Sequence, residues 1–295
     1  MPELPEVEVT KRGVANVLLG HEIVDVFIGS QPLRQPLSPD LLKLKGATVT
    51  KIARRGKYIV LSTTQGSLII HLGMTGHLQI IATSEPRVKH DHFELMLDSA
   101  MSVRYNDTRR FGLLLYVPEG EDPYQQKVLS VLGPEPLEAD FTPEVLLSRL
   151  KKRSCSIKQT LMNSHVVVGV GNIYASEVLF LSHIHPERLA RDITPEEAAV
   201  LVRNIKEVLT ASIASGGTTI RDFEGADGKP GYFVQNLNVY GKAGEACPVC
   251  GTAIEHIVQG GRSTYFCPHC QPRFAPTQPE GEPVQSQPKT KAKTK

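Results

Sequence analysis

The pattern of apolar and polar positions changes character twice along the chain. Residues 4–20 have the spacing of an amphipathic helix, which Pro5 suits in its first turn and Gly20 can end. Between residues 22 and 117, short segments rich in β-branched residues, such as "GKYIVLST" and "GSLIIHLGM", are separated by turn residues at fairly even spacing. Such spacing is typical of an all-β sandwich or barrel-like domain.

Helical periodicity appears in the second half of the chain. The segments "TPEVLLSRLKKR", "SIKQTLMN", "NIYASEVLFLSHI" and "TPEEAAVLVRNIKEVLTASIAS" have this spacing, and two of them begin with a capping threonine and a first-turn proline. A glycine-rich stretch, "GGTTIRDFEGADGKPGYF", then predicts a long loop that is either functional or disordered. From about Ala275 onward the chain is rich in Pro, Gln, Glu, Thr and Lys, so we expect a disordered tail.

Composition narrows the class of protein. At 295 residues the chain is long enough for two domains, and its 40% apolar content is ordinary for a soluble globular protein. The formal net charge is only +2, so a nucleic-acid surface would have to come from local placement of Lys and Arg. The charged N-terminus lacks the apolar core of a secretory signal, and the longest apolar run is far shorter than the ~18 residues of a membrane span. We therefore expect a cytoplasmic protein that does not bind membranes.

Four of the five cysteines are clustered in "CPVCGTAIEHIVQGGRSTYFCPHC". Two CxxC pairs can each form a tight knuckle, and four thiolates can enclose a tetrahedral zinc ion with no open position, so the predicted zinc is structural. The sequence between the pairs alternates around Gly260-Gly261 and predicts a β-hairpin with Arg262 just after its turn. The predicted zinc ligands are Cys247, Cys250, Cys267 and Cys270.

A glycine turn in "VVVGVGNIYASE" precedes one of the predicted helices. Gly169 and Gly171 suit a tight turn, and Asn172 stands where an N-cap residue is expected. A helix N-terminus reached through glycines can bind phosphate, although a capped helix without a ligand is the commoner case. A helical module beside a zinc hairpin is a frequent means of gripping a duplex backbone, which favours a DNA-binding protein.

Basic and apolar residues occur together in three further turns. "RRGKYI" contains two arginines and Lys57, a cluster that usually belongs to a solvated face. "IIHLGMTGHL" places His71 and Met74 around a glycine turn, and "YNDTRRFG" places Arg109 before Phe111. An exposed Met and Phe beside arginines could wedge into stacked bases. The alternative is that these side chains pack in the core, and this is the favoured interpretation when the residues are considered alone.

Together these pieces resemble one family. The stretches "PELPEVE", "RGKY", "HLGM", "RRFG", "VVGVGNIYASE", "DGKPGYF" and the CxxC-x16-CxxC ribbon closely resemble formamidopyrimidine-DNA glycosylase, in the family's order. The resemblance implies an α+β fold with an N-terminal β-sandwich and N-terminal helix, then a helix–two-turn–helix domain with a C-terminal zinc-ribbon hairpin. We expect a catalytic sandwich at 2–130, a helical DNA-binding domain at 131–235, a zinc finger at 236–271 and a disordered tail at 272–295.

The resemblance also implies base-excision repair. The protein would be a monomeric DNA glycosylase and abasic-site lyase that removes 8-oxoguanine and formamidopyrimidines from double-stranded DNA. After removal of Met1, Pro2 would be the nucleophile, because a terminal amine has a pKa of about 7.7–8.0 and is partly unprotonated near neutral pH. Its attack on C1′ would give a Schiff base, followed by β,δ-elimination, without a catalytic metal or an organic cofactor.

The carboxylates near Pro2 receive roles from the same resemblance. Glu3 would be the general acid/base at the sugar. Glu6 lies one helical turn further and would orient the damaged nucleotide in the lesion pocket. Glu8 lies off that face, and we expect it to be a solvated first-turn acid. Without the family pattern, all three would be interpreted as simple helix N-terminal acids.

The remaining contacts with DNA are also implied by the family. Lys57 matches the lysine that grips the phosphate at the lesion and aids elimination, and Arg262 is counted with it among the catalytic residues. Phosphate or other DNA contacts are expected from Asn172, Arg262, His71, His90 and Lys158. Met74, Arg109 and Phe111 would fill the gap left by the flipped base, with Arg109 bonding the estranged cytosine.

Three alternatives remain open at this point. Endonuclease VIII is a near neighbour that prefers oxidised pyrimidines, although the "LPEVE" opening and the "DGKPGYF" loop favour the purine enzyme. A non-catalytic DNA-binding protein could share the ribbon and helices, but it would not need Pro2, Glu3 and Lys57. A zinc-ribbon protein-interaction module would bind duplexes with little dependence on salt. One departure from the family is Thr108, which stands where relatives commonly have proline.

Overall fold

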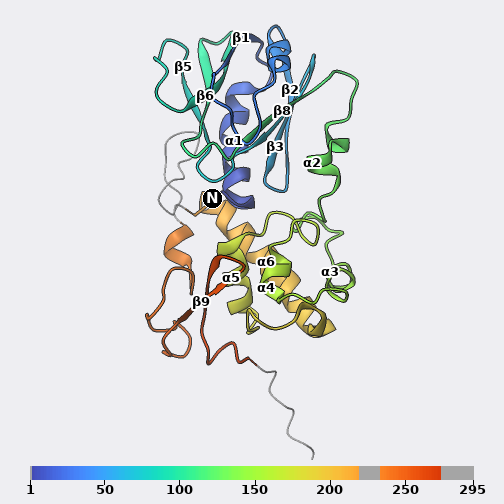
Figure 1. Cartoon of the computed structure of the whole chain (residues 1–295), viewed down its shortest axis with the longest axis vertical. Coiled ribbons are helices and arrows are strands. Elements are labelled where there is room, and N and C mark those ends of the chain that lie inside the picture. Colours follow the sequence, from blue (N-terminus) through green and yellow to red (C-terminus); the bar gives the residue numbers. More distant parts are fainter. Residues whose placement is uncertain (1, 219–232, 274–295) are drawn as a thin grey trace, which may run out of the picture.

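The computed structural model describes residues 2–218 and 233–273 of the chain. Most of the predicted glycine-rich loop lies outside these residues, and so does almost all of the predicted tail. Within them, an upper lobe of strands and a lower lobe of helices meet near the N-terminus, as Figure 1 shows. Among the described residues, no helix combines the length and the apolar character that a membrane crossing requires.

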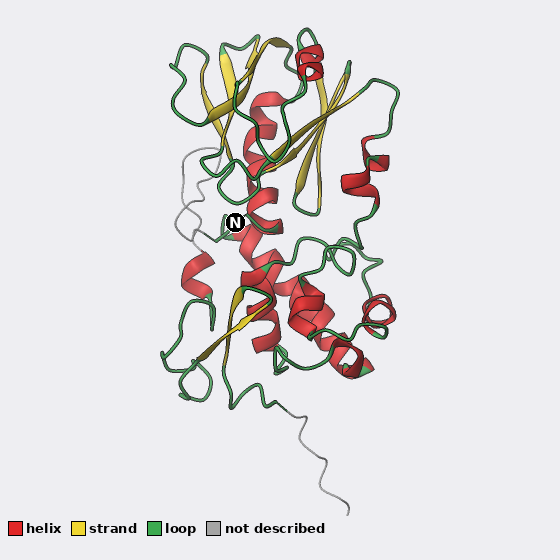
Figure 2. Ribbon diagram, in the orientation of Figure 1, coloured by secondary structure: helices red, strands yellow, loops and turns green. Residues whose placement is uncertain are grey.

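The upper lobe contains two four-stranded antiparallel sheets, with strand orders β1-β6-β7-β5 and β2-β3-β4-β8 (Figure 2). Alternation and turn spacing predicted the strands as far as β7. The pattern missed β8, because a short run of leucines carries no periodicity. The strands are β1 (Ile23–Ile28), β2 (Val49–Arg55), β3 (Tyr58–Thr63), β4 (Gly66–His71), β5 (His77–Ala82), β6 (Asp91–Leu97), β7 (Met101–Asn106) and β8 (Leu113–Val117).

Helix α1 (Leu4–Leu18) packs against the sheets of the upper lobe. Its residues Val7, Val14 and Leu18 join one buried core with apolar residues of both sheets. Pro5 lies in the first turn, and Gly20 follows the end of the helix with a φ of +79°, a conformation that glycine adopts without strain. The predicted N-terminal helix and β-sandwich are confirmed.

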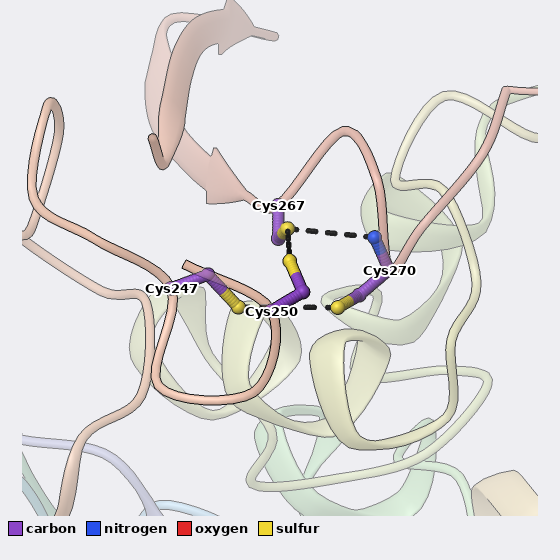
Figure 3. Close-up of side chains that lie close together, drawn as sticks. All are labelled: Cys247, Cys250, Cys267 and Cys270. Atoms are coloured by element: carbon purple, nitrogen blue, oxygen red, sulfur yellow. Dashed lines mark hydrogen bonds between the residues drawn. The ribbon is translucent and has the colours of Figure 1, made fainter. Parts of the chain in front are cut away.

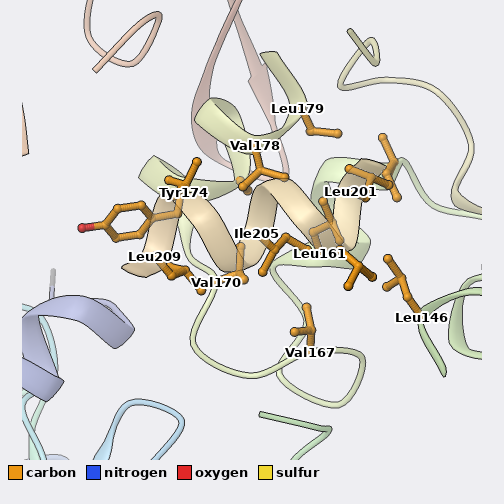
Figure 4. Close-up of a cluster of buried hydrophobic side chains, with 14 of the residues drawn as sticks. Leu146, Leu161, Val167, Val170, Tyr174, Val178, Leu179, Leu201, Ile205 and Leu209 are labelled. Atoms are coloured by element: carbon orange, nitrogen blue, oxygen red, sulfur yellow. The ribbon is translucent and has the colours of Figure 1, made fainter. Parts of the chain in front are cut away.

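The lower lobe is built from helices that surround the buried core drawn in Figure 4. The predicted caps are present, since the hydroxyls of Thr142 and Thr194 accept backbone N–H groups of the first turns that follow them. The α-helices that follow the sandwich are α2 (Lys127–Ser130), α3 (Pro143–Leu150), α4 (Ile157–Leu161), α5 (Asn172–Leu181) and α6 (Pro195–Ala214). Short 3-10 helices are η1 (Pro39–Leu44), η2 (Pro123–Gln125), η3 (Ala190–Asp192) and η4 (Phe233–Asn236).

A two-stranded hairpin of β9 (Glu255–Gln259) and β10 (Arg262–Phe266) ends the described chain. Its turn is Gly260-Gly261, with φ of +55° and +74°, so the predicted hairpin is confirmed. A small core that includes Phe180 of α5 joins this module to the helical lobe. We propose that the three folded units are 2–130, 131–235 and 236–271. Most residues of each buried core fall within one of these ranges, although Leu4 and Leu237 join the helical core and Phe180 joins that of the zinc module.

Candidate active site at the lobe junction

Glu3 lies at the junction of the two lobes, where the N-terminus marked in Figure 1 meets the start of α5. Pro2 beside it is buried. The carboxylate of Glu3 accepts the backbone N–H groups of Gly171 at 2.7 Å and of Ile173 at 3.0 Å. A Cβ atom at Gly171 would lie 2.2 Å from Cδ of Glu3, so this position requires glycine. The anion therefore occupies the positive end of the α5 dipole.

The predicted N-cap of α5 is wrong by one residue. Gly171 is the N-cap and Asn172 is the first helical residue. The Glu3 carboxylate from the other lobe satisfies the N–H groups that a local cap would have bonded. The side chain of Asn172 turns toward the zinc hairpin instead, where its Nδ2 donates to the carbonyl oxygen of Ser263 at 2.9 Å.

Lys158 is buried behind Asn172, and its ammonium has three acceptors within the protein. Its Nζ donates to Oδ1 of Asn172 at 2.8 Å, to the carbonyl oxygen of Ser263 at 3.0 Å and to Oγ1 of Thr264 at 2.6 Å. Burial, only partly opposed by the charge of Glu3, lowers the pKa of Lys158 to about 8. Lys158 thus links α4, α5 and β10, and a phosphate contact would require it to exchange one of these acceptors.

Glu6 lies in a buried pocket one helical turn beyond Glu3. Its Oε2 accepts the backbone N–H of Glu3 at 2.8 Å. Its Oε1 accepts the hydroxyl of Tyr174 at 2.6 Å and the backbone N–H of Thr218 at 2.8 Å. Burial, followed by the nearby charge of Glu3, raises the pKa of Glu6 above its ordinary value. Thr218 lies in the first residues of the glycine-rich loop and is the last one that the structure describes before residue 233, so Glu6 fixes the start of that loop.

Lys57 occupies the two-residue turn between β2 and β3, in which Arg55 pairs with Tyr58. Burial lowers the pKa of Lys57. The charges of Glu3 and Glu6 raise it, and the charge of Arg262 lowers it further. Arg262 itself is exposed at the start of β10. The structure therefore brings Glu3, Glu6, Lys57 and Arg262 from three distant segments into one electrostatic neighbourhood.

His71 ends β4 on the strand paired with the Lys57 turn. Burial, with the nearby charges of Arg34 and Lys57, lowers the pKa of His71 to about 3, so the imidazole is neutral at neutral pH. Its Nδ1 accepts the backbone N–H of Gly73 at 3.0 Å, which places the remaining ring proton on Nε2. A neutral imidazole with Nε2–H can donate a hydrogen bond to a phosphate oxygen.

Asp107, which the sequence pattern did not single out, fixes the two loops that carry Met74 and Arg109. Its Oδ1 accepts the hydroxyl of Thr75 at 2.6 Å, and its Oδ2 accepts the backbone N–H of Gly112 at 2.8 Å. The same Thr75 hydroxyl accepts the backbone N–H of Arg109 at 3.0 Å. One fully buried carboxylate therefore joins the 73–76 turn to the 107–112 loop.

The three predicted wedge residues lie on these joined loops. The side chain of Phe111 is 45% exposed, which rules out core packing for it, and Met74 is half-buried. The guanidinium of Arg109 lies 4.9 Å from the ring centroid of Phe111, within cation–π range. Core packing, the alternative interpretation of these residues, is therefore wrong for Phe111.

His90 lies on the adjacent loop that leads into β6. It lines an open hollow of about 490 Å³ together with Lys89, His92 and Arg110. His90 and Arg110 both have positive φ, of +74° and +57°, which is uncommon for residues with large side chains. His90 therefore belongs to a basic surface beside the Arg109 loop rather than to the junction.

Glu177 is a second buried residue that the sequence pattern did not single out as functional. Its carboxylate accepts the backbone N–H groups of Asn238, Val239 and Tyr240 at 2.7–3.0 Å. The hydroxyl of Tyr240 accepts Nδ2 of Asn172 at 3.3 Å. Glu177 thus fixes the segment between the glycine-rich loop and the zinc module beside Asn172. An acid within the mostly apolar α5 was the available signal.

The four predicted zinc ligands converge at one point, as Figure 3 shows. Their Sγ atoms all lie within 4.8 Å of one another. Four thiolates around a tetrahedral zinc lie about 3.8 Å apart at the usual zinc–sulfur distance, so the cluster fits this ion. Backbone N–H groups of the knuckles point at two of the sulfurs, as the contacts of Val249 with Cys247 and of Cys270 with Cys267 show. The site is a structural zinc centre, because all four positions are filled by protein.

Comparison with known proteins agrees with this geometry. Residues 1–114 match the family model of the formamidopyrimidine-DNA glycosylase N-terminal domain. Residues 132–224 match the model of the formamidopyrimidine-DNA glycosylase H2TH domain, and residues 244–273 match the model of a zinc finger found in FPG and IleRS.

Whole-chain relatives extend the match. The formamidopyrimidine-DNA glycosylase of Legionella pneumophila (strain Lens) is 50% identical over 273 residues, which cover 92% of this chain and 99% of the relative. A solved complex of Lactococcus lactis Fpg with abasic-site DNA has a TM-score of 0.82 at 34% identity, covering 92% of this chain and 99% of that one. A MutM complex with DNA containing carbocyclic 8-oxo-G has a TM-score of 0.83 at 35% identity, covering 92% and 100%. The chain belongs to the formamidopyrimidine-DNA glycosylase family.

Proposed function

We propose that this protein is a DNA glycosylase and abasic-site lyase that removes oxidised purines from duplex DNA during base-excision repair. Membership of the glycosylase family over nearly the whole chain carries the proposal. The relatives solved with abasic-site DNA and with 8-oxo-G DNA support damaged duplexes as the substrate. The gathering of two carboxylates, a lysine and an arginine at the lobe junction supports a covalent mechanism there.

In the first step, the secondary amine of Pro2, once Met1 is removed, attacks C1′ of the damaged nucleotide. A bond forms between this nitrogen and C1′, and the glycosidic bond breaks with its electron pair leaving on the base, which takes up a proton. The Pro2 nitrogen then gives up its proton, and its lone pair expels the ring oxygen O4′, which takes up a proton. The product is an open-chain sugar with a cationic iminium at C1′. Glu3 lies next to Pro2, and each of its oxygens receives one backbone N–H, so each keeps a lone pair for a proton. We assign Glu3 the role of general acid/base.

In the second step, the iminium acidifies the C2′ proton. A base removes this proton, the C2′–C3′ double bond forms, and the 3′ phosphate leaves with the electrons of the C3′–O bond. A second elimination removes the C4′ proton and forms the C4′–C5′ double bond, and the 5′ phosphate leaves with the electrons of the C5′–O bond. Lys57 is the candidate base, because burial lowers its pKa and so increases the fraction of neutral amine near neutral pH. When protonated, the same side chain can hold a phosphate.

Different residues are expected to orient the damaged nucleotide and to bind the strand that carries it. Glu6 fixes Thr218 at the start of the glycine-rich loop, which supports a role in orienting the damaged nucleotide. His71, Asn172 and Arg262 would contact flanking phosphates, and Met74, Arg109 and Phe111 would enter the gap left by the flipped base. Lys158 would act by holding Asn172 and β10 in place, and His90 would contribute to the basic surface near Arg109.

The zinc centre has a supporting part in this scheme. Zinc bound to Cys247, Cys250, Cys267 and Cys270 would hold the base of the β9–β10 hairpin together. Arg262 lies at the far end of that hairpin, beside its turn. We further propose that the protein works as a monomer in the cytoplasm, on nucleoid DNA. Sedimentation of the free protein and of its complex with a lesion duplex tests the monomeric state.

Borohydride trapping tests the proposed function. Mature protein mixed with an 8-oxoguanine duplex and borohydride should give a covalent adduct, and peptide mass spectrometry should locate it on Pro2. A Pro2→Gly variant provides the matched control, since it keeps a terminal amine but loses the secondary one. Absence of an adduct with correctly processed enzyme would count against the mechanism.

Two further measurements separate the alternatives. Cleavage of an 8-oxoguanine duplex should exceed cleavage of a thymine-glycol duplex, and the reverse order would indicate endonuclease VIII-like specificity. Duplex affinity should fall steeply as salt rises, because several phosphate contacts release counterions. A flat salt profile would favour a zinc-ribbon interaction module instead.

A further inference from the structure

Two sequence features have no part in the proposed chemistry, and the structure brings them together. Glu8 of α1 was expected to be solvated, and the arginines beside Lys57 to belong to a solvated face. Both expectations are wrong. Glu8 is buried, and its Oε2 accepts Nε of Arg54 at 3.0 Å. Its Oε1 accepts Nζ of Lys11 and Nε of Arg12, each at 2.8 Å.

Arg54 extends this contact to the segment between the lobes. Its Nη1 donates to Oε2 of Glu135 at 2.8 Å and to the carbonyl oxygen of Gly56 at 3.0 Å. The other oxygen of Glu135 accepts the backbone N–H of Gly56 at 2.6 Å and Nη1 of Arg55 at 3.0 Å. The side chains of Arg54 and Glu135 are only 10% and 14% exposed, so water screens these pairs weakly.

These contacts surround the turn that presents Lys57. Gly56 precedes Lys57 in this turn, and both of its backbone polar groups are bonded within the network. A Cβ atom at Gly56 would lie 3.2 Å from Cβ of Val168, so the turn also presses against the glycine loop of the lower lobe. The network therefore connects three parts: the first turns of α1, the Lys57 turn and the segment at Glu135.

We propose that Glu8, Arg54 and Glu135 form a positioning relay that fixes the Lys57 turn against the second turn of α1, beside the lobe junction. Arg54 can bridge both carboxylates because its guanidinium presents separate donors in a rigid fork. Pro2 and Glu3 lie at the start of the helix that carries Glu8, so the relay sets the distance between the attacking amine and Lys57. A displacement of about 1 Å between such groups can slow a reaction on the order of a hundred-fold. The inference rests on the proposed function, since Lys57 is the group it serves.

Lys57 itself reports on the relay. The charged or titratable groups that face its amine are Glu3 and Glu6 of α1, His71 of β4 and Arg262 of β10. Lys57 is half-buried, so if the turn loosens, more of the amine reaches water and the lowering of its pKa by burial diminishes. Removing the negative charge of Glu8 can by itself only lower the pKa of a nearby lysine. An upward shift in a Glu8→Gln variant would therefore report solvation of Lys57 and not a simple change of charge.

The experiment compares Glu8→Gln, Arg54→Met and Arg54→Lys with an Arg12→Ala control, which removes an exposed partner of Glu8 outside the relay. NMR titration of labelled lysine side chains in the free protein should show an upward shift of the Lys57 midpoint in Glu8→Gln. Strand elimination on a preformed abasic duplex should slow about ten- to a hundred-fold at unchanged duplex affinity. Arg54→Lys should not restore the rate, because one ammonium cannot span both carboxylates. Arg12→Ala should leave both readouts unchanged.

An unchanged Lys57 midpoint together with an unchanged elimination rate in Glu8→Gln would overturn the relay. This variant keeps the shape of the side chain, so it decides the matter even if Arg54→Met does not fold. Full activity of Arg54→Lys would equally contradict the proposal. Failure of the proposed function looks different, since the wild-type protein would then give no borohydride adduct, while the titration, which needs no DNA, would still test the relay.

Discussion

Glu6 and Glu8 lie two residues apart on α1, yet the helix places them in opposite surroundings. Glu6 faces the lobe junction, where neutral donors from Glu3, Tyr174 and Thr218 bond it, and burial raises its pKa. Glu8 faces the β2–β3 hairpin. Although burial opposes the change, hydrogen bonds from Lys11 and Arg12 lower its pKa to about 2.

The difference shows how one helix serves two purposes. Residues two apart on a helix point in different directions, so adjacent acids can enter unrelated networks. The face toward the junction holds carboxylates with backbone dipoles, which leave lone pairs available to a substrate. The face toward the hairpin neutralises its carboxylate with cations, which fixes structure. Four substitutions, in order of decreasing effect, test this division.

The largest effect is expected for Glu3→Gln on the junction face. The amide cannot take up a proton, and its NH₂ group would oppose a backbone N–H of Gly171 or Ile173. We expect glycosylase activity to fall at least about a hundred-fold, the usual range for a lost general acid/base. Single-turnover excision of 8-oxoguanine measures it. Activity within a factor of about three of wild type would show that Glu3 is structural.

Gly171→Ala tests how tightly the junction face is packed. The added Cβ would lie 2.2 Å from Cδ of Glu3, so the carboxylate or α5 must move. We expect a loss of about 2–3 kcal/mol in the free energy of unfolding, as for overpacking of a core. Urea unfolding measures it. Gly20→Ala is the control, because its Cβ meets open space and only backbone strain at φ +79° remains, about 1 kcal/mol.

Glu6→Gln should destabilise by about 2 kcal/mol, because one amide oxygen cannot serve three buried donors. The dependence on pH has a definite sign. The pKa of Glu6 is raised in the folded protein, so wild type loses stability as pH rises from the ordinary value through the folded one. The difference in the free energy of unfolding between wild type and variant should therefore become smaller as pH rises. A difference that grows instead would mean that Glu6 is stabilised as an anion.

Glu8→Gln should give the smallest loss and the opposite pH dependence. The pKa of Glu8 falls from an ordinary 4.5 to about 2, so its stabilisation is complete above 4.5 and disappears as pH falls toward 2. We expect about 1–2 kcal/mol at neutral pH, since solvent screens the exposed Arg12. Chemical unfolding at several pH values measures it. If the free energies of unfolding of wild type and variant depended on pH in the same way, the proposed difference between Glu8 and Glu6 would be wrong.

Much of the fold follows from local patterns that the sequence contains. The caps at Thr142 and Thr194, the Gly260-Gly261 turn and each CxxC pair act within a few residues. Strand β8 escaped because its leucines do not alternate. The N-cap of α5 was misplaced because its N–H groups are satisfied by Glu3, more than 160 residues away in the chain.

The candidate site likewise contains residues that local motifs identify and residues that they do not. Residues in short motifs, such as Lys57, His71 and Arg109, could be named from the sequence, and their roles remain proposals. The supports of those residues could not be named. Asp107, Glu135 and Glu177 each bond segments that are remote in sequence. No local pattern distinguishes Asp107 and Glu135 from ordinary surface acids, and only the apolar surroundings of Glu177 in α5 set it apart. The exposure of Phe111 likewise depends on how its loop is held.

The bond of Asp107 to both loops has a kinetic meaning for a protein that must inspect long DNA. Met74, Arg109 and Phe111 are carried on segments joined by one buried anion, so they would enter a base stack as a single rigid probe. The entropy of ordering the loops is spent during folding and need not be spent again at each base step. Such a probe can test a step and withdraw without refolding, and the speed of a search would then be limited by the stiffness of the DNA.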